Sequence, residues 1–294
     1  MSLLHNLQAG PPFNQATWWL DDKGLEHLIE PLCTSTEKWF LRQLGQVKID
    51  ISPSLIEITW DTGLAEVEAL ETVKLILSDL VEDVTVRLNF FYYGWAHEVY
   101  NDLLATIERI EEIQDCRSVA VLHEVRSTDR PISDVHYANS RIKNGFRSWQ
   151  CAEGKFDKID QIELARMLPY ALVFRSDNKE ENIVYSWVGR DSVAARVYGL
   201  EWTNESIGKI TNRSFGAESQ KFADKVSIGI CETLLTGKPQ YQHFRSLMRV
   251  EGQEPFWAPY ERLLTRHVLR CGTPIVVSDV FPTQYVDIPL AGSP

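Results

Sequence analysis

Few residues in this chain have the spacing that catalysis or metal binding would need. His97 and His123 are each followed by a glutamate, but neither has a second ligand at metal-binding spacing, and no HExxH motif occurs. No serine lies in a GxSxG turn, the turn that presents one class of hydrolase nucleophile. The acidic pairs, such as Asp21 with Asp22, fit solvated surfaces. We therefore expect no enzyme activity and no metal site.

An aromatic run at residues 89–95, NFFYYGW, is the candidate for a small-molecule site in the N-terminal half. We expect a strand to run into a helix through Gly94, and open α/β sheets bind ligands in a crevice at such strand ends. Tyr93, Gly94 and Trp95 are therefore candidate crevice residues. Gly94 stands alone, without the glycine spacing that cradles phosphate, and the same aromatic residues also fit core or interface packing.

Charge and cysteine usage limit the compartments and partners that fit this chain. The net charge of −11 disfavours attraction to nucleic acid or to anionic membranes. Residues 1–13 have no basic region followed by an apolar core, so we expect no signal peptide, and no apolar run reaches the roughly 18 residues that cross a bilayer. The cysteines are scattered and odd in number, which favours a reducing, cytoplasmic location. They are Cys33, Cys116, Cys151, Cys231 and Cys271.

The length of 294 residues favours two domains. Residues 1–16 read as a flexible lead-in and residues 17–127 as an α/β domain. The polar, proline-containing stretch 127–131 marks the candidate boundary. Residues 128–154 would form a linker and connecting helix, followed by a second domain at residues 155–290.

Hydrophobic periodicity in the N-terminal half predicts an α/β sandwich with at least one parallel strand pair. The expected order is two short helices within 18–44 broken near Pro31, a hairpin at 47–60, a helix at 65–80, a strand at 84–93, a helix at 98–113 and a strand at 118–125.

The predicted connecting helix at 135–152 carries one apolar face, formed by Ile142, Phe146 and Trp149. Such a face can dock on its own domain or pair with a second copy of the chain. A homodimer is therefore an expected assembly.

The C-terminal half alternates short strands with one long helix. The expected order is a helix at 156–168, strands at 170–175 and 183–188, a short helix at 192–198 closed by Gly199, a turn at 205–210, a long helix at 217–235 and strands at 241–250, 257–269 and 274–281.

This order resembles the PAS domain, in which two strands, small helices, one long helix and a three-stranded meander complete a five-stranded antiparallel sheet with helices on one face. The run VYSWVGRDSVAARVYG at 184–199 is similar to a bacterial PAS-like family. Residues 260–264 look like the fourth strand of that family, and 275–281 look like the last. The resemblance covers slightly under half of the chain.

The resemblance implies a cavity between the sheet and its helices that could bind a small ligand. Its candidate lining is Tyr185, Trp187, Phe222, Val226, Leu247 and Leu263. The same side chains could instead fill the core. Both interpretations expect Tyr185 and Trp187 to point to one face of their strand.

No cofactor is assigned on the strength of the resemblance. Photoactive flavin-binding PAS domains carry a reactive cysteine before the long helix, whereas the nearest cysteine here, Cys231, lies within it and fits a small buried side chain. Haem-binding members take a histidine from the long helix or nearby, and none occurs at 217–235. His243 and His267 on predicted strands are the remaining candidate haem ligands.

The resemblance implies a sensory or regulatory protein that acts by binding a small ligand or a protein partner. We expect no output domain after the last predicted strand, and therefore action through a partner or through a homodimer. An alternative is an N-terminal α/β enzyme or small-molecule-binding domain regulated by the PAS-like half.

Overall fold

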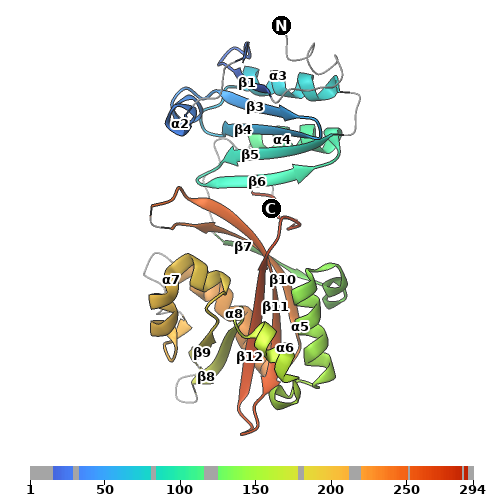
Figure 1. Cartoon of the computed structure of the whole chain (residues 1–294), viewed down its shortest axis with the longest axis vertical. Coiled ribbons are helices and arrows are strands. Elements are labelled where there is room, and N and C mark those ends of the chain that lie inside the picture. The colour runs from blue at the N-terminus through green and yellow to red at the C-terminus, as the bar shows by residue number, and fades with distance from the viewer. Residues whose placement is uncertain are drawn as a thin grey trace. The chain divides into compact units, whose positions relative to one another are not determined.

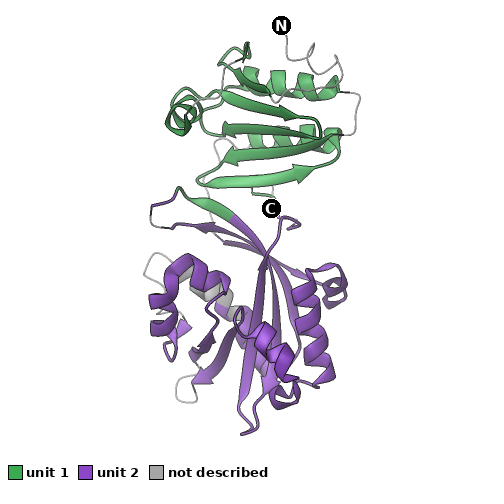
Figure 2. Ribbon diagram, viewed as in Figure 1, with its two compact units in different colours: residues 1–122, 254–257, 289–294 green, residues 123–253, 258–288 purple. Residues whose placement is uncertain are grey.

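A computed structural model describes residues 16–28, 33–80, 84–115, 125–177, 182–211, 220–250, 252–286 and 288–290, with only the backbone described at 220–226 and 228. The chain forms two compact units (Figure 2). Unit 1 comprises residues 1–122, 254–257 and 289–294, and unit 2 comprises residues 123–253 and 258–288. Both units combine helices with β-sheet, so the fold is mixed α/β. The predicted lead-in at 1–16 lies almost wholly outside the described residues.

The strands of unit 1 follow the order β2-β1-β3-β4-β5-β6 (Figure 1). The predicted hairpin and the predicted parallel pair are both confirmed: β3 pairs antiparallel with β4, and β4 pairs in parallel with β5. The strands are β1 (Ala16–Leu20), β2 (Glu26–Leu28), β3 (Val47–Ser52), β4 (Leu55–Asp61), β5 (Thr85–Phe91) and β6 (Trp95–Tyr100).

Helices cover both faces of the sheet in unit 1. Helices α3 (Val67–Ser78) and α4 (Leu103–Asp115) pack side by side, and α4 reaches the sheet through Arg109 and Glu98. Helix α2 (Thr34–Arg42) packs on the opposite face, where Phe40 contacts Trp19 at a ring distance of 5.1 Å. Strand β1, which lies between these layers, therefore buries side chains on both sides.

Two predicted helices in unit 1 are wrong in part. Within 18–44 the chain forms β1 and β2 before α2, because Trp18, Trp19 and Leu20 are all buried between the two helical layers and so show no alternation. The predicted helix at 98–113 begins with the end of β6. Strand β6 does not show the alternation of apolar and polar residues that indicates a strand, because one of its inward-facing residues is the charged Glu98.

The described strands of unit 2 follow the order β7-β10-β11-β12-β8-β9. Antiparallel pairing joins β7 to β10, β11 to β12, β12 to β8 and β8 to β9. The strands are β7 (Val125–Arg130), β8 (Leu172–Asp177), β9 (Asn182–Val188), β10 (Gln240–Met248), β11 (Phe256–Val268) and β12 (Pro274–Pro282). From β8 onward, each agrees with the prediction to within two residues.

Helices lie on both faces of this sheet, so the expectation of helices on one face is wrong (Figure 1). Phe174, Leu264 and Val276 pack on the side of α7 (Val193–Ser206) and α8 (Gln220–Thr236). The alternate residues on the same strands, such as Val173 and Leu263, face the other way. That second face is covered by η1 (Ile132–Tyr137), α5 (Ser140–Cys151), η2 (Phe156–Lys158) and α6 (Gln161–Met167).

The stretch predicted as a boundary and linker belongs to unit 2. Residues 127–130 belong to strand β7, whose polar composition fits an edge strand, and among the described strands it pairs with β10 alone. The predicted connecting helix is α5, and its apolar face is occupied within the unit: Ile142 is fully buried beside Tyr241 and Leu263. Most of the strand predicted at 118–125 lies outside the described residues.

Helix α7 breaks at Gly199, where φ is +87° and ψ is 168°. This non-helical residue confirms that the short helix starting near Ser192 ends at Gly199.

We predict that Arg109→Ala destabilises unit 1 by about 3–5 kcal/mol. Arg109 donates to buried Glu98 at 2.8 Å and 3.2 Å, so its removal leaves a carboxylate without its compensating charge. Hydrogen exchange of the amides in α4 and β6 would measure the loss.

The matched control is Arg166→Ala, which breaks the exposed pair with Glu163 and should cost less than about 1 kcal/mol. The double variant Glu98→Leu with Arg109→Leu should recover much of the stability, because it leaves no charge unpaired. Equal effects of Arg109→Ala and Arg166→Ala would contradict the prediction.

Candidate functional site

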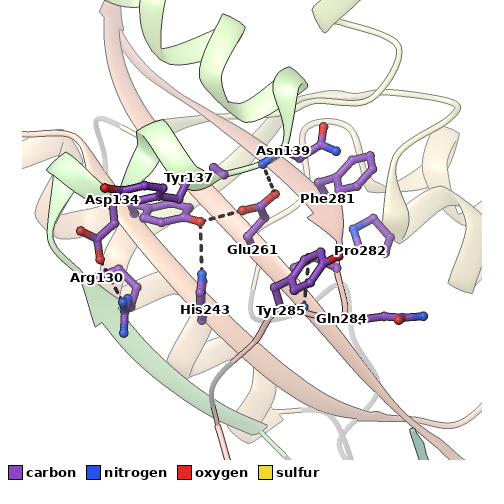
Figure 3. Close-up of a pocket in the computed structure, with 13 residues that line it drawn as sticks. Arg130, Asp134, Tyr137, Asn139, His243, Glu261, Phe281, Pro282, Gln284 and Tyr285 are labelled. Atoms are coloured by element: carbon purple, nitrogen blue, oxygen red, sulfur yellow. Dashed lines mark hydrogen bonds and ion pairs between the residues drawn. The ribbon is translucent and has the colours of Figure 1, made fainter. Parts of the chain in front are cut away.

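A pocket of about 720 Å³ opens on the face of unit 2 that carries η1 and α5 (Figure 3). Strands β10, β11 and β12 provide its floor, and η1, the start of α5 and the segment after β12 provide its walls. It is lined by Arg130, Asp134, Tyr137, Ala138, Asn139, Tyr241, His243, Glu261, Phe281, Pro282, Thr283, Gln284 and Tyr285.

A hydrogen-bonded group of three side chains lies on the floor of the pocket. Tyr241 donates its hydroxyl to Glu261 Oε2 at 2.6 Å, and its oxygen lies 3.1 Å from His243 Nε2. Because the tyrosine proton is given to Glu261, the contact with His243 requires the proton on Nε2. The backbone N–H of Asn139 donates to Glu261 Oε1 at 2.9 Å. The carboxylate, which is only 3% exposed, is therefore held by both a strand and a helix start.

The pocket carries one uncompensated negative charge when His243 is neutral. Arg130 pairs with Asp134 at 3.0 Å, whereas Glu261 receives only neutral donors. Burial raises the pKa of the Tyr241 hydroxyl, and the adjacent Glu261 adds to that rise. The hydroxyl stays protonated at neutral pH, so the group offers acceptors and a neutral donor rather than a nucleophile.

Two exposed aromatic side chains stand at the rim of the pocket. Tyr137 is 86% exposed and Tyr285 is 90% exposed, although both belong to a residue type that is usually half-buried. The ring of Phe281 lines the wall nearby (Figure 3). The arrangement can hold a flat ring between aromatic surfaces while hydrogen-bond donors on that ring reach Glu261.

The predicted PAS-like lining is not brought together on one face. Tyr185 is buried on the α7 and α8 side, 5.0 Å from the Phe174 ring, whereas Trp187 is 43% exposed and donates its indole N–H to Leu168 O at 2.8 Å. The expectation that Tyr185 and Trp187 share a face is wrong. A bulge in the β8–β9 pairing places Tyr185 opposite Phe174 and Trp187 opposite Val173.

The other four predicted lining residues are also divided. Leu263 is buried against Ile142 on the α5 side, opposite to Tyr185. Leu247 is buried on β10. Phe222 and Val226 belong to α8, but their side chains lie outside the described residues. The described members, Tyr185 above all, contribute to packing as the second interpretation expected.

The two candidate haem ligands have different environments. His243 is half-buried and lines the pocket, whereas His267 is fully buried, with Nε2 3.1 Å from Thr265 Oγ1 and its ring edge-on to Phe156. Burial lowers the pKa of His267 to about 4, so it is neutral at physiological pH. As haem ligands both remain predictions. Cys231 is half-buried and packs against the core beside Ile230.

The N-terminal crevice was predicted on a connection that the structure does not have. Tyr93 and Gly94 form the turn of the β5–β6 hairpin, in which Phe91 pairs with Trp95, so the strand runs into a second strand and not into a helix. Tyr93 adopts a φ of +57°, and the Trp95 indole donates to Glu254 Oε2 at 2.8 Å. Ligand binding by Tyr93, Gly94 and Trp95 stays a prediction, but the strand-to-helix connection on which it was based is a hairpin turn.

The sequence reasoning missed Tyr241 and Glu261, the residues at the centre of the pocket. A signal was present for Glu261, because a glutamate in the middle of an apolar strand has to be paired or to face a cavity. No sequence signal placed Tyr241 beside it, since the contact depends on the pairing of β10 with β11.

No protein-family model, curated protein or solved structure matches the chain. Among the described residues, no helix combines the length and apolar character needed to cross a membrane. Within the same residues, no three histidine, cysteine, aspartate or glutamate side chains are grouped closely enough to hold a metal ion.

We predict that folding stability falls as the pH drops from about 6.5 to about 4, in part because of His267. Its folded pKa lies below its ordinary value of 6.5, so acid protonates the unfolded chain first. The contribution of His267 to the free energy of unfolding is fully present above about pH 6.5, and roughly 3 kcal/mol of it is lost by about pH 4. Urea unfolding across this range would measure it.

The variant His267→Gln should show a weaker decline in this range, whereas the exposed control His136→Gln should follow the unmodified chain. Identical pH profiles for all three proteins would contradict the assignment.

Proposed function

We propose that unit 2 is a PAS-like sensory or regulatory unit that binds a small ligand, with the pocket around Glu261 as its binding site. The ligand is a planar ring that carries hydrogen-bond donors or a positive charge. Ligand occupancy would be passed to a protein partner or to a second copy of the chain.

The order of strands supports the PAS-like part of this proposal. Strands β9, β8, β12, β11 and β10 lie in that sequence across the sheet, so the first hairpin sits beside the last strand of the meander, as in a five-stranded PAS sheet. Helix α8 contacts β9 and β12. Helices on the second face go beyond the family pattern, and they form the walls of the proposed binding site.

The observation that carries the ligand proposal is the buried carboxylate of Glu261 at the floor of an open pocket with exposed tyrosines at its rim. A carboxylate that receives two hydrogen bonds still has free lone pairs. Since the pocket has a net negative charge, it favours a cationic or donor-rich ring over an anionic one. The exposed side chains of Tyr137 and Tyr285 would become covered when the ring of the ligand binds.

We predict that the full chain binds benzamidine more tightly than benzamide, and benzoate least of all. The three probes share a planar ring and differ in charge, so Glu261 should rank them in this order. Ligand-observed saturation-transfer NMR would measure the ranking. Glu261→Gln should lower benzamidine binding to about the level of benzamide.

Tyr137→Ala should weaken all three probes, because it removes ring contact and not charge. The control Glu232→Gln changes an exposed glutamate on α8 and should have no effect. Preference for benzoate, or benzamidine binding that Glu261→Gln leaves unchanged, would sink the proposal.

A further inference from the structure

A second, smaller cavity lies on the same face of unit 2, between α5, α6 and β12. It measures about 150 Å³, the space of about five water molecules at about 30 Å³ each. Its inner wall is Asp279, which is 2% exposed and sits in the middle of β12. Gly145 of α5 faces the carboxylate directly: a Cβ at this position would stand 2.7 Å from Asp279 Oδ2. The glycine therefore keeps the space in front of the carboxylate open.

The carboxylate of Asp279 is not satisfied by the described residues. Its Oδ1 has no hydrogen-bond partner among them, and the described side chains form no ion pair with it within 4.0 Å. The charge of Arg141 acts on it, but the guanidinium donates to Val280 O at 3.0 Å and lies over the Tyr170 ring at 4.1 Å. A buried carboxylate without a partner costs several kcal/mol, unless something in the cavity pairs with it.

The cavity adjoins a wider hollow at the surface of unit 2. The two share Asn144, Ser148, Ile159, Glu163 and Arg166, and the outer one has a volume of about 460 Å³. The outer hollow adds Arg147, Lys158 and Asp160. A narrow ligand can therefore enter from the surface and reach Asp279 with one end.

We propose that this cavity binds the primary ammonium group of a small amine, with Asp279 as its acceptor. A cation is the ligand group that best offsets a buried negative charge, since it restores neutrality and donates hydrogen bonds at once. The side chains of Ser140, Asn144 and Ser148 add neutral oxygens that can accept the remaining ammonium protons. This site is separate from the pocket around Glu261 and does not rest on the function proposed for it.

The charged groups that line the cavity are Asp279, Arg141, Glu163 and Arg166, and Tyr170 lies beside Arg141. Burial raises the pKa of Asp279 to about 7, and Arg141 acts in the opposite direction. Because ammonium binding needs the ionised carboxylate, affinity for an amine should rise from pH 6 to pH 8. The guanidinium of Arg141 stays charged across this range, and Glu163 forms an ion pair with Arg166.

The test uses the full chain with three probes: n-butylamine, 4-aminobutyrate and butyrate. Calorimetric titration at pH 8 should show binding of both amines and none of butyrate at this site. Tighter binding of 4-aminobutyrate than of n-butylamine would mean that Arg147 or Arg166 also binds the carboxylate at the other end of the ligand. Equal binding would assign recognition to the ammonium group alone. Either result supports the proposal.

Asp279→Asn should weaken the amines about ten- to a hundredfold and remove their pH dependence. The variant keeps the side-chain shape and removes a buried charge, so it should fold. Glu232→Gln on α8 is the matched control and should bind as the unmodified chain does. In the unmodified chain, n-butylamine should shift the Gly145 amide resonance. Amine binding that survives Asp279→Asn, or no binding with an unmoved Gly145 resonance, overturns the proposal.

Discussion

Helices cover both faces of strands β11 and β12, and this constraint decides what every polar side chain on those strands must do. A charged group that is buried there is shielded from bulk water, so it needs a hydrogen-bonding partner or has to border a cavity. Arg262 has such a partner in Gln242. Its Nε donates to Gln242 Oε1 at 3.0 Å, and the Gln242 side chain donates to Asp129 at 2.7 Å. Burial still lowers the pKa of Arg262 to about 10.

The two faces of the sheet in unit 2 therefore differ in character. On the α7 and α8 side, rings such as Phe174, Tyr185 and Trp202 contact one another, and Arg262 is satisfied by its neighbours. On the α5 side, Glu261 lines an open pocket and Asp279 borders a cavity, with no hydrogen-bond partner for its Oδ1 among the described residues. Alternate residues on the same two strands thus divide between a packed face and the face that carries the two proposed binding sites.

Most of the elements could be predicted from the sequence, because their periodicity was undisturbed. The three last strands and the β3–β4 hairpin follow directly from alternation and turn residues. The errors arose where tertiary contacts override the pattern: Trp18 to Leu20 are buried on both sides, Glu98 is buried by its pair with Arg109, and a bulge turns Trp187 away from Tyr185.

The candidate site could be predicted only in fragments. His243 was singled out from its residue type, but its neighbours Tyr241 and Glu261 were not, since their proximity follows from strand pairing and from the backbone of Asn139. Asp279 and Gly145 meet across a helix and a strand that are far apart in the chain. Local patterns carry no information about such pairs.

Unit 1 contains residues from three separate parts of the chain, and this has a consequence for biosynthesis. The segment 254–257 supplies Phe256 as a partner of Trp95, and the Trp257 indole donates to Tyr92 O at 2.8 Å. A ribosome releases this segment only after most of unit 2 has been made. Until this segment is made, Trp95 at the outer edge of β6 lacks its partner Phe256, and an unpaired strand edge is a site where chaperones bind and where chains associate wrongly.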